Sequence, residues 1–181
     1  MKTYSGHSIA QNPASPCPPE WSGQLVAIPV RFIRFYGGGR RRVTDTGIIE
    51  VHCDLAEDVE EFFEFMMAVQ FPLSSVKPLS FFGWNDEHSM AANNTSGFNR
   101  RKIAGTERWS KHAFGGAIDI NPLLNPCVCG GIVQPAGAVY DPSRLGALTA
   151  NSPITQFLKA RGWTWGGDWD SPKDYQHFQK P

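Results

Sequence analysis

The chain has 181 residues, of which 41% are hydrophobic, 12% aromatic and 19% charged, a composition typical of a single globular domain. Seventeen basic and seventeen acidic side chains give a formal net charge of zero, which excludes a bulk attraction to nucleic acid or to a membrane surface. No apolar run approaches the roughly 20 residues that a membrane-spanning helix needs.

Residues 1–23 are rich in proline and predict an extended lead-in, whereas residues 24–181 are expected to form one domain. Met1 to Gln11 contain one lysine and no apolar stretch, which is not the pattern of a Sec signal peptide. We therefore expect synthesis in the cytoplasm and, for any action outside it, release by another route. We also expect a monomer.

The first part of the domain is predicted to form a hairpin and a helix. Leu25–Tyr36 and Val43–Val51 are rich in β-branched and aromatic residues and predict two strands. The loop 37–42, with three arginines, is interpreted as a solvated turn in preference to a contact for an anionic polymer. Asp54 is expected to cap a helix that ends before Pro72 and buries one apolar stripe, formed by Leu55, Val59, Phe62, Phe63 and Met66.

Further along the chain, the signals are shorter. Leu79–Trp84 predicts a strand and residues 85–97 predict a loop. After a long Gly- and Pro-rich connection, Ser152 and Pro153 open a helix that Gly162 ends.

The segment Ser110–Pro122 carries the strongest chemical signal. Ala117–Ile120 predicts a short strand, and Asp119 is a carboxylate in an otherwise apolar segment, which is costly to bury without a positive partner. A zinc ion bound by Asp119 and His112 would provide that partner, with His177 as the best candidate for a third ligand.

Three protein ligands and an open fourth position are typical of catalytic zinc, which lowers the pKa of a water molecule. Asp174 precedes His177 by three residues and is predicted to act as the acid/base. Arg101 or Arg100 is expected to stabilise negative charge on the substrate. The remaining histidines, His7, His52 and His88, are interpreted as structural or surface residues.

The cysteines are predicted to be reduced. Cys127 and Cys129 lack a second pair at zinc-site spacing, so we interpret them as surface thiols in preference to a second metal site. Trp163, Trp165 and Trp169 have two open interpretations, packing in the core or lining a substrate cleft.

Four motifs in this order resemble one known family. They are F-N-x-R from Phe98, S-x-H-x6-D-I-N-P from Ser110, G-x-x-W-G-G-D-W from Gly162 and D-x-x-H-F from Asp174. Together they resemble the zinc D-alanyl-D-alanine carboxypeptidases and L-alanyl-D-glutamate endopeptidases, which include bacterial wall-remodelling enzymes and phage endolysins. The similarity is clear from about Asn94 to Phe178.

The resemblance implies one Zn²⁺ bound by His112, Asp119 and His177, with Asp174 as the catalytic acid/base and Arg101 at the substrate. It places Ser110 where it supports the site or binds substrate. Arg100 and Trp165 are further substrate-binding candidates from the sequence itself. It also implies an α+β fold of the LAS or hedgehog-like class, in which helices pack on a small antiparallel sheet and the zinc lies in a cleft on that sheet. Arg100 and the C-x-C segment depart from the family pattern.

The sequence therefore predicts a zinc metallopeptidase that hydrolyses the stem peptide of peptidoglycan, its expected partner. Within that class, the D-I-N-P and W-G-G-D-W segments favour an L-alanyl-D-glutamate endopeptidase, as in endolysins, over a D-alanyl-D-alanine carboxypeptidase. An alternative of another class is a non-catalytic zinc module that binds the cell wall. An endolysin would reach the wall through a phage-made membrane lesion.

Overall fold

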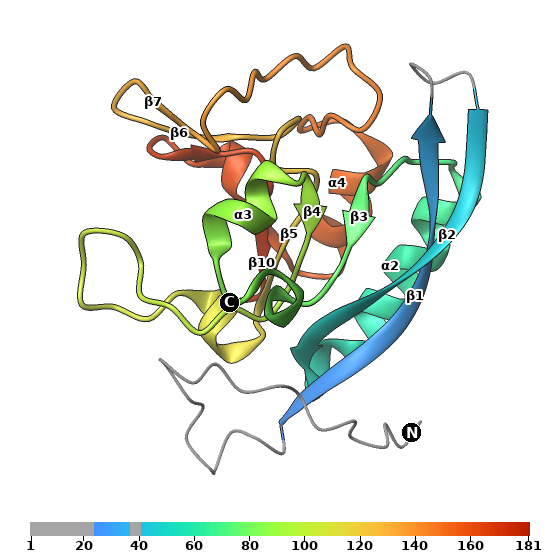
Figure 1. The fold of residues 1–181 in the computed structure, drawn as a ribbon, viewed down its shortest axis with the longest axis horizontal. Coiled ribbons are helices and arrows are strands. Elements are labelled where there is room, and N and C mark those ends of the chain that lie inside the picture. Colours follow the sequence, from blue (N-terminus) through green and yellow to red (C-terminus); the bar gives the residue numbers. More distant parts are fainter. Residues whose placement is uncertain (1–23, 37–40) are drawn as a thin grey trace.

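The computed structural model describes residues 24–36 and 41–181, so the predicted lead-in and the tip of the loop 37–42 lie outside the described residues. The fold mixes α and β structure, with small, mostly antiparallel sheets and few helices (Figure 1). This agrees with the predicted α+β class at that level of detail. Among the described residues, no helix combines the length and the apolar character that crossing a bilayer requires.

A long antiparallel hairpin forms one side of the molecule (Figure 1). Strands β1, Leu25–Tyr36, and β2, Arg41–His52, pair along their whole length, with Leu25 opposite His52. Both predicted strands are confirmed, and β2 extends slightly beyond its predicted ends. Most of the buried apolar side chains of the hairpin belong to the main core of the molecule, which also contains Ile118 and Phe178 of the later strands.

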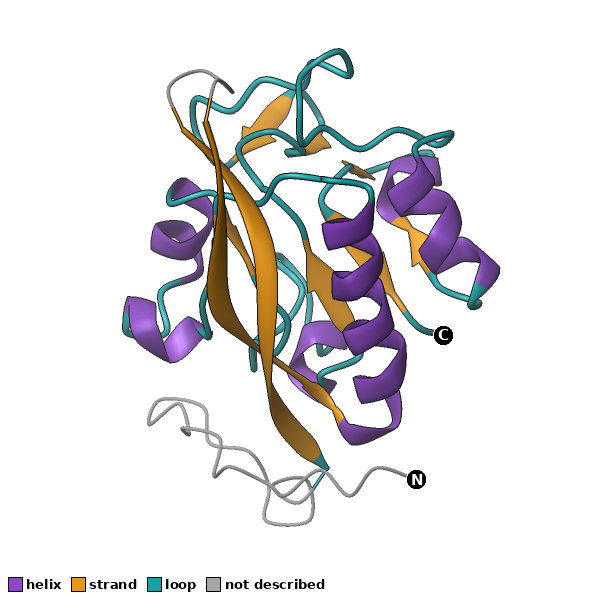
Figure 2. Cartoon of the chain, turned by 90° about the vertical axis from the view of Figure 1, so that its right-hand side faces the viewer, coloured by secondary structure: helices purple, strands orange, loops and turns teal. Residues whose placement is uncertain are grey.

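Helix α2, Ala56–Ala68, runs along the hairpin and separates it from α4, Pro153–Ala160 (Figure 2). The predicted apolar stripe is confirmed for Val59, Phe62, Phe63 and Met66, which are buried together with Ala56. The inclusion of Leu55 is wrong, because it lies in the preceding 3-10 helix and is only partly buried. The predicted cap is wrong. Asp54 lies inside a short 3-10 helix, η1, Cys53–Leu55, whose cap is His52, and α2 starts after it without a side-chain cap.

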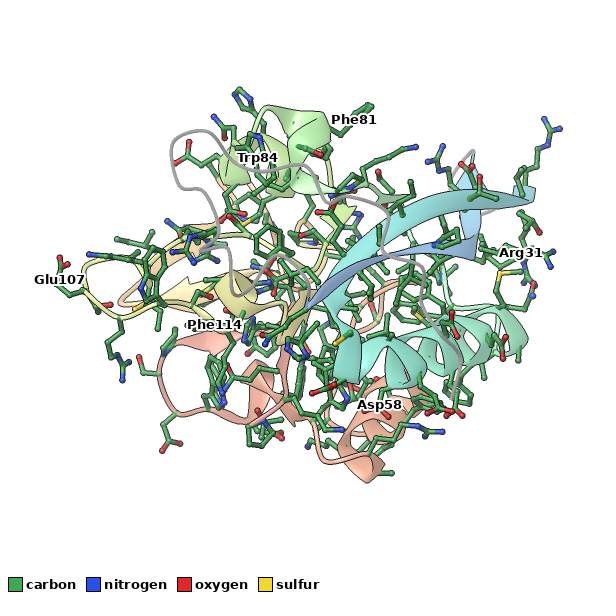
Figure 3. The ribbon with its side chains drawn as sticks, turned by 90° about the horizontal axis from the view of Figure 1, so that it is seen from below. Arg31, Asp58, Phe81, Trp84, Glu107 and Phe114 are labelled. Carbon is green, nitrogen blue, oxygen red and sulfur yellow. The ribbon has the colours of Figure 1, made fainter. Side chains whose placement is uncertain are left out.

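Contacts between aromatic rings and charged groups fix α2 against the C-terminal part of the chain. Phe157 on α4 stacks on Phe65 with ring centroids 4.5 Å apart. Asp58 lies on α2 (Figure 3). It accepts hydrogen bonds from Trp163 Nε1 at 3.0 Å and from Lys180 Nζ at 2.6 Å. These contacts hold the final strand in place, and that strand carries His177.

The remaining strands are short and build three small sheets. Two have three strands each, in the orders β5-β10-β8 and β7-β6-β9, and the third is the parallel pair β3-β4. The bounds are β3 Ser75–Val76, β4 Asn94–Thr95, β5 Ala117–Asp119, β6 Cys127–Cys129, β7 Ile132–Gln134, β8 Thr164–Trp165, β9 Lys173–Asp174 and β10 His177–Gln179. Backbone hydrogen bonds between Ser96 and Asp119 join the β3-β4 pair to β5.

Two predictions for the middle of the chain are wrong. Leu79–Trp84 is not a strand, because Leu79–Phe82 forms a 3-10 helix, η2, that Gly83 ends in a left-handed conformation. The predicted loop 85–97 contains helix α3, Asp86–Ala91, and strand β4. The Asn85 side chain caps α3 by accepting a hydrogen bond from the His88 backbone N–H at 2.9 Å. An asparagine that indicates a turn can equally start a helix.

The predicted helix near the C-terminus is confirmed. Ser152 caps α4, Pro153 is its first residue, and Gly162 follows its end with φ +79°. Two more 3-10 helices complete the described chain, η3 at Lys111–Phe114 and η4 at Gly166–Asp168.

Candidate metal centre

The first predicted ligand, His112, lies in the short helix η3, whose ends fix its position. Ser110 Oγ accepts a hydrogen bond from the His112 backbone N–H at 3.3 Å. At the other end, Gly115 has φ +66°, a conformation that favours glycine, and a Cβ there would lie 2.4 Å from the His52 backbone nitrogen. The turn between His112 and β5 therefore requires a glycine at position 115, and Ser110 supports the site as a cap.

Sheet register places the other two predicted ligands side by side. In the antiparallel pair β5-β10, Asp119 lies directly opposite His177. Directly opposed residues share one face of a sheet, so the carboxylate and the imidazole project in the same direction. The chain segments that carry them are 58 residues apart.

The side chains of His112, Asp119 and His177 converge. Asp119 Oδ2 lies 3.1 Å from His112 Nε2, Asp119 Oδ1 lies 3.0 Å from His177 Nδ1, and the two ring nitrogens lie 3.1 Å apart. All three residues are buried, with exposed fractions of 2%, 8% and 7%. Ligand atoms around a tetrahedral zinc ion are separated by roughly 3.4 Å, given bonds of about 2.0–2.2 Å to nitrogen and oxygen. The cluster is close to that size.

Each imidazole uses its outer nitrogen as a donor to a fixed oxygen. His112 Nδ1–H donates to the Gly97 carbonyl at 2.6 Å, and His177 Nε2–H donates to Gln179 Oε1 at 3.1 Å. Such partners set the tautomer of metal-binding histidines. The nitrogen that faces Asp119 can then offer a lone pair, which is what a metal ion requires.

The electrostatics also favour a cation between these side chains. Burial alone would raise the pKa of the Asp119 carboxyl, but the charge of His112 and the hydrogen bonds of both histidines hold it well below its usual range. Burial alone would lower the pKa of His177, but the hydrogen bond and charge of Asp119 raise it. The anionic carboxylate thus attracts positive charge, and the donor set of two imidazoles and one carboxylate fits zinc.

Asp174 lies next to this cluster on β9. Burial raises its pKa to about 6, and the negative charge of Asp119 adds to the rise, while the charges of His177 and His112 oppose it. Within the described residues, Asp174 Oδ1 is buried without a hydrogen-bond partner. A carboxyl with a raised pKa and an unpaired oxygen is typical of a general acid/base.

Cys127 is a neighbour of the site that the sequence analysis missed. It pairs with Asp174 across strands β6 and β9, and burial together with the charges of Asp174 and Asp119 raises the pKa of its thiol to about 12. The prediction of a surface thiol is therefore wrong for Cys127, although Cys129 is exposed. The described cysteines, Cys53, Cys127 and Cys129, are free. Cys127 and Asp174 are neighbours because β6 pairs with β9, and the spacing of residues in the sequence does not indicate that pairing.

The side chains of the other predicted substrate-binding residues have partners outside this cluster. The Arg101 guanidinium forms an ion pair with Asp86 on α3, with Nε and Oδ2 2.9 Å apart, and that of Arg100 lies over the Trp109 ring. Trp165 is 3% exposed and belongs to the main core, and its Nε1–H donates to the Tyr175 carbonyl. This placement favours core packing for Trp165.

The buried cluster of two histidines and an aspartate could hold one metal ion beside a second, ionisable carboxyl. In agreement, residues 104–180 match the model of a peptidase family described as D-alanyl-D-alanine carboxypeptidase. The matched segment is less than half of the chain. It includes the three predicted ligands and Asp174 but neither Arg100 nor Arg101. Comparisons with curated proteins and with solved structures gave no match.

Proposed function

We propose that this protein is a zinc peptidase that hydrolyses the stem peptide of peptidoglycan. The observation that carries the proposal is the convergence of His112, Asp119 and His177, with an ionisable carboxyl at Asp174 beside them. The family match over residues 104–180 supports the same activity. Within this class we propose an L-alanyl-D-glutamate endopeptidase that acts on the cell wall, on the strength of the D-I-N-P and W-G-G-D-W segments.

The chain's own residues would share the reaction as follows. His112, Asp119 and His177 would hold the zinc ion, which when bound activates a water molecule and polarises the scissile carbonyl. Asp174 would accept a proton from the attacking water and return it to the nitrogen of the departing amine. Gly97 and Gln179 would keep the two imidazoles in the required tautomer through the hydrogen bonds described above.

Digestion of purified sacculi separates this proposal from its close alternative. An L-alanyl-D-glutamate endopeptidase produces peptides with a new amino-terminal D-glutamate, which mass spectrometry identifies. A D-alanyl-D-alanine carboxypeptidase releases free D-alanine instead, and that result would overturn the bond specificity while keeping the peptidase class. A non-catalytic wall-binding module would bind sacculi and release neither product.

The raised pKa of Asp174 predicts the acid limb of the pH profile. The base must be ionised to accept a proton, so kcat/KM is expected to fall as the pH drops through the pKa of Asp174. That pKa is about 6 before a cation is bound, and a nearby positive charge lowers it, so we expect the midpoint between the ordinary aspartate value of about 4 and 6. The measurement is kcat/KM from pH 4 to 8, with bound zinc determined at each pH. A flat profile down to pH 4 with zinc retained would contradict this role.

The activity is also expected to depend on the small size of Gly166, which packs against Asp174. A Cβ at Gly166 would lie 2.5 Å from the Asp174 carbonyl oxygen and 2.8 Å from its Cβ, so η4 and β9 would have to move apart. Because displacement of a catalytic group by about 1 Å can cost 100-fold, Gly166→Ala is expected to reduce kcat by roughly 10- to 100-fold with zinc retained.

Gly116→Ala is the matched control, because a Cβ there would meet the Lys111 carbonyl at 3.4 Å, an ordinary contact. Sacculus hydrolysis by both variants is measured alongside their thermal unfolding. Equal activity of Gly166→Ala and the unmodified protein would show that hydrolysis does not depend on the close packing of Gly166 against Asp174.

A further inference from the structure

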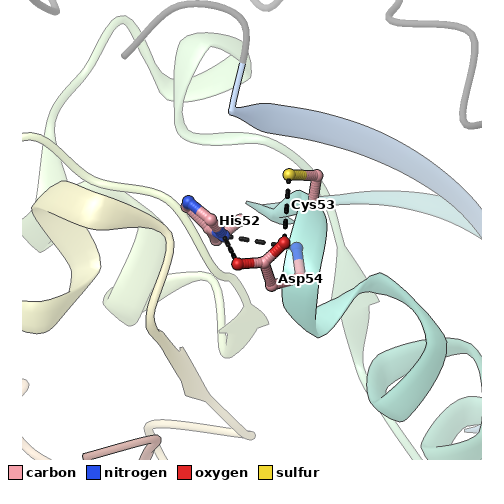
Figure 4. Close-up of side chains that lie close together, drawn as sticks. All are labelled: His52, Cys53 and Asp54. Carbon is pink, nitrogen blue, oxygen red and sulfur yellow. Dashed lines mark hydrogen bonds and ion pairs between the residues drawn. The ribbon is translucent and has the colours of Figure 1, made fainter. Parts of the chain in front are cut away.

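A second group of metal-ligating side chains lies outside the candidate metal centre. His52 ends β2, and Cys53 and Asp54 begin η1. One donor atom from each, the imidazole nitrogen, the thiol sulfur and a carboxylate oxygen, lie within 4.8 Å of one another (Figure 4). His52 was predicted to be a structural or surface residue, and the activity proposed above uses none of the three side chains.

The separations in this group are near those of a tetrahedral zinc site. His52 Nδ1 lies 3.6 Å from Asp54 Oδ2, and Cys53 Sγ lies 3.6 Å from Asp54 Oδ1. Zinc bonds of about 2.0–2.2 Å to nitrogen and oxygen and about 2.3 Å to sulfur give tetrahedral edges of roughly 3.4–3.6 Å. The two distances involve different oxygens of the Asp54 carboxylate, and one donor atom from each residue lies within 4.8 Å of the others, so the three side chains must draw closer to share one ion.

A contact from outside the group prepares His52 for metal binding. His52 Nε2–H donates to Gln24 Oε1 at 3.3 Å, so its proton lies on the outer nitrogen and Nδ1 carries a lone pair. That lone pair now accepts the Asp54 backbone N–H at 3.2 Å. Because the Asp54 side chain is 81% exposed, water can reach this end of η1 and satisfy the N–H when an ion takes its place.

We propose that His52, Cys53 and Asp54 form a second, solvent-accessible site for a divalent cation that accepts sulfur ligands, such as Zn²⁺. One nitrogen, one sulfur and one oxygen donor suit zinc and cobalt, whereas magnesium and calcium prefer oxygen alone. On binding, the Cys53 thiol releases its proton to solvent and coordinates as the thiolate.

The site joins segments that are distant in the sequence. The His52 backbone N–H donates to the Gly115 carbonyl at 3.0 Å, in the turn after His112, and the Cys53 N–H donates to the Gln24 carbonyl at 2.6 Å. A bound ion would therefore stabilise the junction of β1, β2 and the turn that supports the candidate metal centre.

Cobalt is the probe that separates the two sites. A cobalt ion bound to a thiolate has a sulfur-to-metal charge-transfer band in the near ultraviolet, and the predicted ligands His112, Asp119 and His177 include no sulfur. Titration of the metal-free full chain with Co²⁺ is expected to give two bound equivalents and one such band. Cys53→Ser is expected to lose the band and one equivalent, and to keep sacculus hydrolysis unchanged.

Cys127→Ser is the matched control, because that thiol lies beside Asp174, and it is expected to keep the band. Asp54→Asn changes an exposed side chain and is expected to weaken Co²⁺ binding at this site at least about tenfold, which tests the proposal should Cys53→Ser fail to fold. Absence of the band in the unmodified protein, its survival in Cys53→Ser, or its loss in Cys127→Ser would each overturn the proposal.

Discussion

Asp174→Asn is expected to abolish sacculus hydrolysis and to leave bound zinc unchanged. Asparagine has nearly the shape of aspartate but cannot accept a proton, so the attacking water loses its base. General acid–base catalysis contributes about 10²- to 10⁴-fold, and the loss of kcat should fall in that range. Zinc binding should persist, because Asp174 is not among the three clustered ligands.

The fold should tolerate this change for a physical reason. Burial raises the pKa of Asp174, which means that the native environment disfavours its charged form, so a neutral amide removes that cost. Asp141→Asn is the matched control, since Asp141 is a partly exposed carboxylate whose Oδ1 accepts hydrogen bonds from Ser143 in the same loop. Peptide release from sacculi and bound zinc are measured for both variants. Hydrolysis by Asp174→Asn at the unmodified rate would assign the base to another group.

The elements that sequence analysis predicted correctly are those with long or chemically specific signals. The strand Leu25–Tyr36 is a run of twelve residues rich in Val, Ile and Phe, and α2 buries a stripe at helical spacing. The convergence of His112, Asp119 and His177 follows from coordination chemistry, since a buried carboxylate between apolar residues needs a positive partner. None of these inferences required knowledge of strand register.

The elements that were missed depend on contacts between distant segments. Leu79–Phe82 is too short for its apolar run to distinguish a strand from a 3-10 helix. Cys127 reaches Asp174 only because β6 pairs with β9, and no residue near Cys127 indicates that pairing. Asp54 was predicted to cap the helix, but His52 is the residue that caps η1. An imidazole nitrogen can accept a hydrogen bond from a backbone N–H, as a carboxylate does.

His177→Ala is expected to lose one equivalent of zinc and all measurable hydrolysis. The change leaves His112 and Asp119 as the only ligands of the cluster, and two protein ligands hold zinc far more weakly than three. It also removes the imidazole that faces Asp119 Oδ1, with Nδ1 3.0 Å from that oxygen, so the buried carboxylate keeps only His112 of its two histidine neighbours. His88→Ala, an exposed histidine on α3, is the matched control and should change neither zinc content nor hydrolysis.

Removal of zinc from the unmodified protein should have the same effect on hydrolysis as His177→Ala. A ligand present at 100 times its Kd stabilises the folded state by about 2.7 kcal/mol, so a chelator should lower Tm and abolish hydrolysis, and added zinc should restore both. The Tm shift is measured in a Cys53→Ser background, so that the second proposed site does not contribute. In that background His177→Ala should show no chelator-dependent shift. Two results would show that His177 does not hold a catalytic zinc ion. One is a chelator-dependent Tm shift in His177→Ala as large as that of the protein with His177, and the other is hydrolysis that survives the chelator.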